Sequence, residues 1–271
     1  MRLVCWNVQW CRGLDGEVDP ARIAAYVQSV DADLACFQEL ASNFPELPGS
    51  DGEDQPVELW QCLPDHQPAV GWGVDVPGPG GTRKRFGNLI LSRLPVGRIL
   101  RHSLPWPAAP DVPSMPRTAV EAVVGAPFGA LRIITTHLEY YSASHRAAQI
   151  ARLREIVLEG SAKRKGEDEP GPFASQPGSA SAVLCGDFNM PADDPLHAEL
   201  RKAGLVDAWQ SMNPGMPHPP TFRLHEPKDG VAPYCCDFVF VTPDLVPRLR
   251  SIRIDADNRA SDHQPVIVEL R

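Results

Sequence analysis

Two polar residues stand at the end of an apolar run in the second half of the sequence. Residues 181–185 are mostly apolar, and Gly186, Asp187, a phenylalanine and Asn189 follow them directly. Uncharged residues would be easier to bury at the end of a strand. A carboxylate and a carboxamide at this place are instead suited to holding a water molecule and a phosphate oxygen. This chemistry requires further polar side chains to converge on the same point.

Polar residues also interrupt or end the other apolar runs of the chain. They are Asn7, Glu39, Asn88, His137, Asp237, Asp262 and His263. Burying so many polar groups is costly unless they pair with one another or bind a metal ion. Because a sheet brings the ends of its strands together, we expect these side chains to form a single cluster.

The elements that must position this cluster alternate between strands and helices. Residues 3–8 read as an apolar strand, and Asp19 and Pro20 supply an N-cap and a first helical residue. Apolar residues at helical spacing continue to position 30, and residues 32–40 form the next strand, which reaches Glu39. This order predicts an α/β layered fold whose sheets are covered by helices.

Further elements follow the same pattern along the chain. Within residues 43–82 we expect strands around Leu59 and Val70, and residues 103–117 form a proline-rich loop. The remaining expected strands are 86–93, 118–125, 131–140, 235–242 and 265–271, and the expected helices are 144–158 and 193–204. Residues 160–181 are polar and rich in Gly, Ser and Pro, which indicates either a domain linker or a flexible loop. The strand pattern resumes unchanged afterwards, so we predict one domain over residues 1–271 with a loop inserted at 160–181.

Composition limits the classes of function. The net charge of −8 argues against a broad basic face for binding DNA, although a metal ion can supply local positive charge to a phosphate site. The seven cysteines include no CxxC pair and several lie in apolar runs, so we expect reduced thiols, a cytoplasmic location and no zinc site made of these cysteines. The first apolar run is too short for a signal peptide, and we expect no membrane-spanning segment and no obligate protein partner. The histidines outside the cluster show no pairing in the sequence.

Seven segments resemble, in the same order, the motifs of the DNase-I-like endonuclease/exonuclease/phosphatase superfamily. They are WNVQW, QEL, GNLILSR, THLEYYSASHRAAQ, GDFN, CDFVFV and SDHQPV. GDFN alone is short enough to occur by chance, whereas the ordered set covers essentially the whole chain. The resemblance implies an α/β four-layer sandwich, in which two packed, mostly antiparallel or mixed β-sheets are flanked by helices. It also implies a metal-dependent hydrolase that acts on phosphate esters.

The resemblance implies a metal site at one edge of the sheets. Glu39 matches the principal ligand, Asn7 lies next to it, and Asp262 is the further carboxylate of that site. Oxygen ligands of this kind suit Mg²⁺ or Mn²⁺, which keep several water molecules. As alternatives, Glu39 alone could be a solvated strand end, and Asn7 could be a hydrogen-bonded core residue.

The resemblance also assigns the groups that act on the phosphate. Asp187 and Asn189 orient or activate the attacking water, and His263 contacts the phosphate with Asp237 hydrogen-bonded behind it. His137 lies on the other side and stabilises the charge of the transition state or assists the leaving oxygen. Two candidates for the general base stay open, namely Asp187 and the Asp237–His263 pair.

Two further residues are candidates for contact with the substrate. Asn88 either contacts the substrate or caps a turn after Gly87, and Arg117 could touch the phosphate. The chain has no visible membrane element, which favours a nucleic acid as the substrate, whereas its acidic net charge counts against this choice. The alternatives are a lipid headgroup or small molecule as the substrate, and an inactive scaffold of the same fold.

Overall fold

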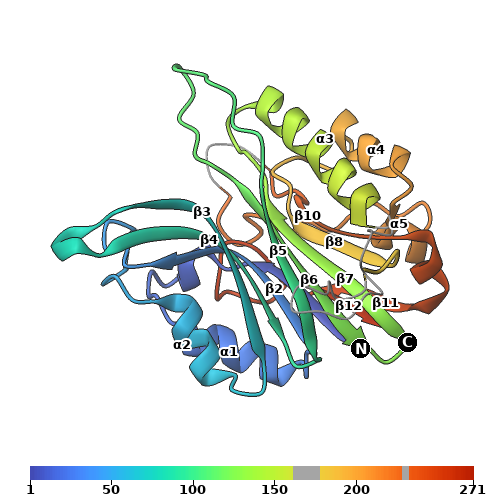
Figure 1. Ribbon diagram of the computed structural model, residues 1–271, viewed down its shortest axis with the longest axis horizontal. Coiled ribbons are helices and arrows are strands. Elements are labelled where there is room, and N and C mark those ends of the chain that lie inside the picture. The colour runs from blue at the N-terminus through green and yellow to red at the C-terminus, as the bar shows by residue number, and fades with distance from the viewer. Residues whose placement is uncertain (161–177, 228–231) are drawn as a thin grey trace, which may run out of the picture.

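Two six-stranded sheets form the centre of the computed structural model, which describes residues 1–160, 178–227 and 232–271 (Figure 1). From edge to edge, the first sheet contains β11 (Leu249–Ile254), β12 (Val266–Leu270), β1 (Arg2–Asn7), β2 (Leu34–Ser42), β4 (Arg83–Ser92) and β3 (Gln67–Pro77). The second contains β5 (Val96–Ser103), β6 (Thr118–Ala126), β7 (Gly129–His137), β8 (Ala182–Asp187), β10 (Asp237–Val241) and β9 (Val206–Asp207). Both sheets mix parallel and antiparallel pairs.

Helices cover the outer face of each sheet. In Figure 1, α1 (Pro20–Ser29) and α2 (Gln55–Cys62) lie on one side, and α3 (Ala143–Gly160) and α4 (Pro195–Lys202) lie on the other. A short helix, α5 (Ala208–Met212), follows β9, and three 3₁₀ segments are η1 (Gln9–Cys11), η2 (Pro79–Gly81) and η3 (Pro243–Arg248). Buried side chains such as Cys5, Val120 and Val183 fill the space between the sheets. The four-layer α/β sandwich implied by the resemblance is therefore confirmed.

Local sequence signals account for the starts of the first two helices, although one of these helices was expected to be a strand. Asp19 caps α1 by accepting a hydrogen bond from the backbone of Arg22, as its sequence position predicts. The expectation of a strand around Leu59 is wrong, because this residue lies in α2. Asp54 caps that helix and Pro56 occupies its first turn, so the segment has the start signals of a helix and buries Leu59 as part of its apolar face.

The remaining differences concern short elements. The strand expected around Val70 is β3, whereas β5, β9, β11 and α5 had no counterpart among the expected elements. The loop expected at 160–181 lies mostly outside the described residues. None of the described helices combines the length and the apolar character needed to cross a membrane.

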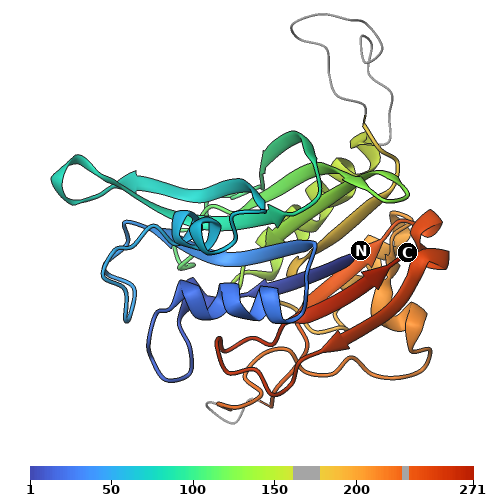
Figure 2. The same cartoon turned by 90° about the horizontal axis from the view of Figure 1, so that it is seen from below.

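The strand directions bring several strand ends to one edge of the sandwich. β1 runs parallel to β2, and β7 runs parallel to β8. β12 is antiparallel to β1, and β10 is antiparallel to β8. The carboxyl ends of β1, β7 and β8 therefore meet the amino ends of β10 and β12. The chain termini lie together at the other end, where the amino group of Met1 donates to the carbonyl of Leu270 at 2.8 Å (Figure 2).

A buried ion pair joins the second sheet to the end of α3. Arg132 is fully buried and donates to Glu121 Oε1 at 2.8 Å. The same guanidinium donates to the carbonyl oxygens of Ile156 at 2.7 Å and Val157 at 3.0 Å. His102 Nε2 also lies 3.0 Å from Glu121 Oε2. Arg132 thus satisfies carbonyl groups in the last turn of the helix while it neutralises a buried carboxylate.

We expect Arg132→Met to lower the free energy of unfolding by about 3 kcal/mol, as measured by urea denaturation, because it leaves a buried carboxylate without its cation. His102 still contacts Glu121, which keeps the loss at the lower end of the usual range. The matched control is Arg152→Met, since Arg152 lies on α3 and pairs with Glu155 at 2.8 Å where that side chain is 62% exposed. Its loss should cost under about 1 kcal/mol. Equal losses in the free energy of unfolding for Arg132→Met and Arg152→Met would contradict the conclusion that Arg132 neutralises a buried carboxylate.

Candidate active site

A bulge in β2 directs Glu39 toward the edge where the strand ends meet. The β2–β4 register shifts between Phe37 and Leu40, and Glu39 adopts a φ of 60°. A non-glycine residue in this region of backbone space is strained, and such strain concentrates at functional sites. The bulge places Glu39 beside Asn7, the last residue of the neighbouring strand β1. The sheet therefore delivers a carboxylate and an amide to one point.

A glycine makes the equivalent arrangement possible at the end of β8. Gly186 has a φ of 148°, and a Cβ at this position would lie 1.9 Å from the carbonyl oxygen of Thr136. Only glycine fits so close to β7. The next residue, Asp187, is then paired in register with His137 on one side and Asp237 on the other. The glycine of the GDFN segment thus lets three polar residues align across three strands.

Asn189 leaves the strand in a second strained conformation. Its φ is 49°, and its backbone N–H donates to Asp187 Oδ1 at 2.9 Å. Its side-chain amide donates to the carbonyl oxygen of Leu138 at 2.8 Å and lies 2.9 Å from His137 Nε2. Asn189 therefore fixes the positions of both the aspartate and the histidine.

The oxygen Oδ2 of Asp187 lies at the centre of the polar cluster. Asn7 Nδ2 donates to this atom, Oδ2, at 2.9 Å and to Glu39 Oε1 at 3.1 Å. His137 Nε2 lies 3.5 Å from the same Asp187 oxygen, and His263 Nε2 lies 3.7 Å from it. His137 Nε2 is also 3.8 Å from Glu39 Oε1. Five of the residues expected to converge therefore lie together, namely Asn7, Glu39, His137, Asp187 and His263.

His263 is held from behind by a chain of hydrogen bonds. Its Nδ1 lies 2.9 Å from Asp237 Oδ2, and Thr221 Oγ1 donates to that oxygen at 2.6 Å. Trp6 Nε1 donates to the carbonyl oxygen of His263 at 2.9 Å, and the ring of Phe222 lies 4.5 Å from the imidazole ring. The hydrogen bond to the Asp237 carboxylate requires a proton on Nδ1. The other ring nitrogen, Nε2, faces Asp187 and the open side of the site.

The two histidines have opposite electrostatic surroundings. Burial alone would lower the pKa of His263, but the charges of Asp237 and Asp187 and the hydrogen bond with Asp237 raise it to about 10. Burial lowers the pKa of His137 well below its usual value, and the charges of Arg117 and His263 lower it further. Burial also raises the pKa of Asp187. The site therefore combines a cationic imidazole with a neutral one.

The donor set beside Glu39 fits a divalent cation of the magnesium class. Burial and then the charge of Asp262 raise the pKa of Glu39 to about 7, because both effects disfavour the ionised carboxylate. Asp262 Oδ2 accepts a hydrogen bond from Gln9 Nε2 at 3.0 Å. Asn7 Oδ1 accepts from the backbone of Gln9 at 3.1 Å, so direct ligation by Asn7 requires its amide to turn over. Glu39 and Asp262 supply the oxygen ligands that Mg²⁺ prefers.

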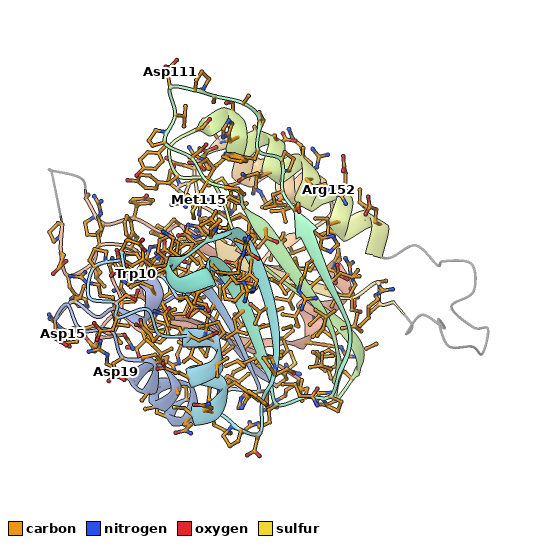
Figure 3. The ribbon with its side chains drawn as sticks, turned by 60° about the vertical axis from the view of Figure 1, so that its left-hand side comes forward. Trp10, Asp15, Asp19, Asp111, Met115 and Arg152 are labelled. Atoms are coloured by element: carbon orange, nitrogen blue, oxygen red, sulfur yellow. The ribbon has the colours of Figure 1, made fainter. Side chains whose placement is uncertain are left out.

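A cavity of about 590 Å³ opens above the polar cluster, and Glu39, His137, Asp187 and His263 line it. Its volume falls in the range of small-molecule sites. Aromatic rings form much of its wall, namely those of Trp10, Phe44, Phe86, Tyr140, Tyr141 and Phe222. Figure 3 shows Trp10 and Met115, which also lines the cavity, on the same side of the molecule. The organic group of a phosphate ester bound at the cluster would thus lie in a cavity lined by aromatic rings.

Arg117 places a cation in the wall of this cavity. Its Nε lies 3.7 Å from Glu139 Oε2, and Nε and Nη1 have no hydrogen-bond partner among the described residues. Burial lowers the pKa of Arg117. Asn88 lies nearby and donates to the carbonyl oxygen of Thr118 at 2.9 Å, which ties β4 to β6. Contact of either residue with a substrate stays a prediction.

The structure adds contacts made by residues to which the motifs assign no role. Thr221 holds Asp237, Phe222 packs on His263, Gln9 holds Asp262 and Glu139 lies beside Arg117. Thr221 and Phe222 follow two prolines in a stretch without an apolar pattern, so no local signal marks them. Only the fold brings these residues to the cluster.

Comparison with known proteins gives a consistent result. A family model described as "Endonuclease/Exonuclease/phosphatase family" matches residues 4–263. No curated protein gives a significant match. Among solved structures, an endonuclease/exonuclease/phosphatase from Beutenbergia cavernae is similar with a TM-score of 0.76 and 24% identity, over 100% of this chain and 71% of the other.

Two other solved structures are of phosphatases that are named for different substrates. A mannosyl-6-phosphatase from Bacteroides thetaiotaomicron has a TM-score of 0.71 and 19% identity, over 100% of this chain and 99% of the other. A 3′ phosphatase from Neisseria, solved with a product DNA hairpin, has a TM-score of 0.63 and 20% identity, over 100% and 99% of the two chains. At these identities the likenesses show the shared fold.

Proposed function

The chain belongs to the endonuclease/exonuclease/phosphatase family of hydrolases that act on phosphate esters, and from this premise we propose that it cleaves its ester by in-line attack of water with a divalent cation bound. One observation carries the proposal. Asp187 Oδ2 lies within 2.9 Å of Asn7, 3.5 Å of His137 and 3.7 Å of His263, on the floor of an open cavity. In this proposal Asp187 is a proton acceptor that lies beside the groups that hold the phosphate.

Each residue of the cluster has a distinct role in this proposal. Mg²⁺ or Mn²⁺ at Glu39 and Asp262, next to Asn7, would withdraw electron density from the phosphate. Asp187 accepts the proton of the attacking water, because its raised pKa makes it a better base than an exposed aspartate. The resulting negative charge on the phosphate oxygens faces the imidazolium of His263.

His137 serves the opposite side of the phosphate in this proposal. Its lowered pKa keeps the imidazole neutral, and Asn189 Nδ2 lies 2.9 Å from its Nε2. A neutral ring adds no second imidazolium next to His263, and it can donate to a phosphate oxygen only in the tautomer that carries its proton on Nε2. Asp237 does not touch the substrate. It acts through His263 and is a positioning residue.

We propose that the substrate is a nucleotide or the end of a nucleic acid. The ring wall of the cavity supports this assignment, because a nucleobase stacks on aromatic side chains whatever its sequence. Tyr140 and Tyr141 are 42% and 62% exposed, and although their rings pack edge to face on each other, their exposed surface can receive a base. Figure 3 places Asp111 at the outer tip of the segment between β5 and β6, which also supplies Met115 to the cavity wall.

A small phosphate monoester is the second candidate, and the charges around the cavity favour it. Lys84 pairs with Glu46 at 2.8 Å, and Arg83 pairs with Asp75 at 2.7 Å on the neighbouring hairpin. Neutralised cations of this kind attract a long phosphate backbone weakly. A sugar phosphate or lipid headgroup needs only the cluster itself and the confined space above it.

A substrate panel assayed with Mg²⁺ separates these candidates. We expect release of nucleotides or terminal phosphate from short oligonucleotides, no activity in EDTA, and a low rate on sugar phosphates. The control is Tyr141→Ala, which should raise KM for the oligonucleotide and leave turnover of a small aryl phosphate unchanged, since the ring touches only the organic group. Rapid release of phosphate from sugar phosphates with intact oligonucleotides would instead establish the second candidate. Hydrolysis unaffected by EDTA would exclude the metal-dependent mechanism.

A further inference from the structure

A second group of metal-ligand side chains lies apart from the cluster around Asp187. His197 Nε2 and His218 Nε2 each lie 2.9 Å from Asp207 Oδ2. His197 belongs to α4, Asp207 ends β9, and His218 follows α5. The three ligand atoms lie within 4.8 Å of one another. The sequence shows no pairing for these histidines, and only the fold brings them together.

Packing imposes this convergence on both imidazole rings. The ring of His197 lies 4.8 Å from that of Phe238 and 5.1 Å from that of Phe240. The ring of His218 lies 5.3 Å from that of Phe238. Asp207 is held as well, because its Oδ1 accepts from the backbone of Gln210 at 3.0 Å at the start of α5. The neighbouring rings and the Gln210 backbone thus hold the three side chains in place, while His197 Nδ1 has no hydrogen-bond partner among the described residues.

The surroundings provide space for one small occupant. A cavity of about 10 Å³ is lined by Asp207, His218, Cys235 and Asp237 among others. That volume is close to the minimum for a single water molecule. Exposure is also low, since the side chains of His197, Asp207 and His218 are 1%, 2% and 6% exposed. An ion bound here would be shielded from solvent, so water molecules would not readily replace its protein ligands.

We propose that His197, Asp207 and His218 bind a structural divalent ion of the zinc class at a site distinct from the catalytic one. Two imidazole nitrogens and one carboxylate oxygen form a donor set that Zn²⁺ accepts, whereas Mg²⁺ prefers oxygen alone. Tetrahedral ligands at ~2.0–2.1 Å from the ion are about 3.3 Å apart. Each Nε2–Oδ2 separation would therefore widen by about 0.4 Å on binding, a shift within the reach of side-chain adjustment. A water molecule in the adjoining cavity completes the coordination.

Such an ion would link the second sheet to the back of the catalytic site. It would fasten α4, β9 and the segment after α5 to one another. Its cavity also borders Asp237, which orients His263. The ion itself would contact neither the substrate nor the attacking water. Its loss should therefore lower stability first, and turnover only through the position of Asp237.

The test is metal binding by the full chain after removal of all metal with a chelator. We expect about one Zn²⁺ per chain with submicromolar affinity, a raised melting temperature in Zn²⁺, and visible absorption bands of a four-coordinate site with Co²⁺. Glu39→Gln should retain this ion, because its substitution affects the catalytic site alone. His66→Gln, a buried histidine elsewhere, is the matched control and should also retain it.

His218→Gln and Asp207→Asn should abolish the Zn²⁺ stabilisation and the Co²⁺ bands. His218 lies on a loop, so this variant is expected to fold even if substitutions at the other two positions do not. Two results would overturn the proposal. One is the same Zn²⁺ stoichiometry and affinity in His218→Gln as in the parent chain. The other is loss of all Zn²⁺ binding in Glu39→Gln, which would assign the ion to the catalytic site.

Discussion

Replacing Asp187 with asparagine is expected to lower kcat by about 10⁴-fold, because the substitution removes the proton acceptor and keeps the shape of the side chain. The backbone of Asn189 can still donate to the remaining oxygen, as it does to Asp187 Oδ1 at 2.9 Å. The backbone of β8 should therefore stay in place. KM should change far less than kcat, since the cation and His263 still hold the phosphate.

The measurement is a comparison of kcat and KM for Asp187→Asn with those of the parent chain, in saturating Mg²⁺ on the best substrate of the panel. Asp111→Asn is the matched control, since Asp111 lies at the exposed tip of a loop (Figure 3). It should match the parent chain. Melting temperatures establish that both variants fold. A loss of less than about 10-fold in Asp187→Asn would remove Asp187 from the role of general base and leave the Asp237–His263 pair.

The sequence indicated the site well wherever a polar residue follows an apolar run. Asn7, His137 and Asp187 each end a strand. A polar residue after a mostly apolar run marks each of these positions in the sequence. Strand direction then requires them to meet at one edge of the sandwich. The fold class follows from the same pattern, because strands that are apolar on both faces need cover from both a second sheet and helices.

The residues that the sequence did not indicate depend on contacts over long distances along the chain. Thr221 reaches Asp237 from a proline-rich stretch, and Asp207 joins His197 to His218 through an irregular segment. The bulge at Glu39 is also invisible in the pattern, since it arises from the register of β2 against β4. Leu59 is a different case, because its apolar run alone fits a strand and a helix equally well, and only the start signals at Asp54 and Pro56 distinguish the two.

The second large loss of kcat is expected on substitution of Asp237, which acts only through His263. Asp237 Oδ2 accepts hydrogen bonds from Thr221 and faces His263 Nδ1, while Oδ1 has no hydrogen-bond partner among the described residues. An asparagine can keep its oxygen in the first position and place its NH₂ group in the second. Asp237→Asn should thus preserve the orientation of the imidazole ring and remove the negative charge behind it.

We expect Asp237→Asn to lower kcat by about 10²-fold and Asp237→Ala to lower it by about 10³–10⁴-fold, because the alanine also frees the ring. Thr221→Val, which removes one hydrogen bond to the carboxylate, should cost about 10-fold. The downfield proton resonance of a histidine Nδ1–H bonded to a carboxylate should be present in the parent chain and absent in Asp237→Ala.

These three variants separate the charge of Asp237 from its hydrogen bond. Equal losses in Asp237→Asn and Asp237→Ala would mean that the charge alone matters and that Phe222 and Trp6 suffice to orient the ring. Unchanged kcat in both variants, with intact folding, would exclude His263 from charge stabilisation and would assign that role to the cation and Arg117. The graded loss predicted here instead requires a ring that is both held and charged from behind, which is what the contacts of Asp237 provide.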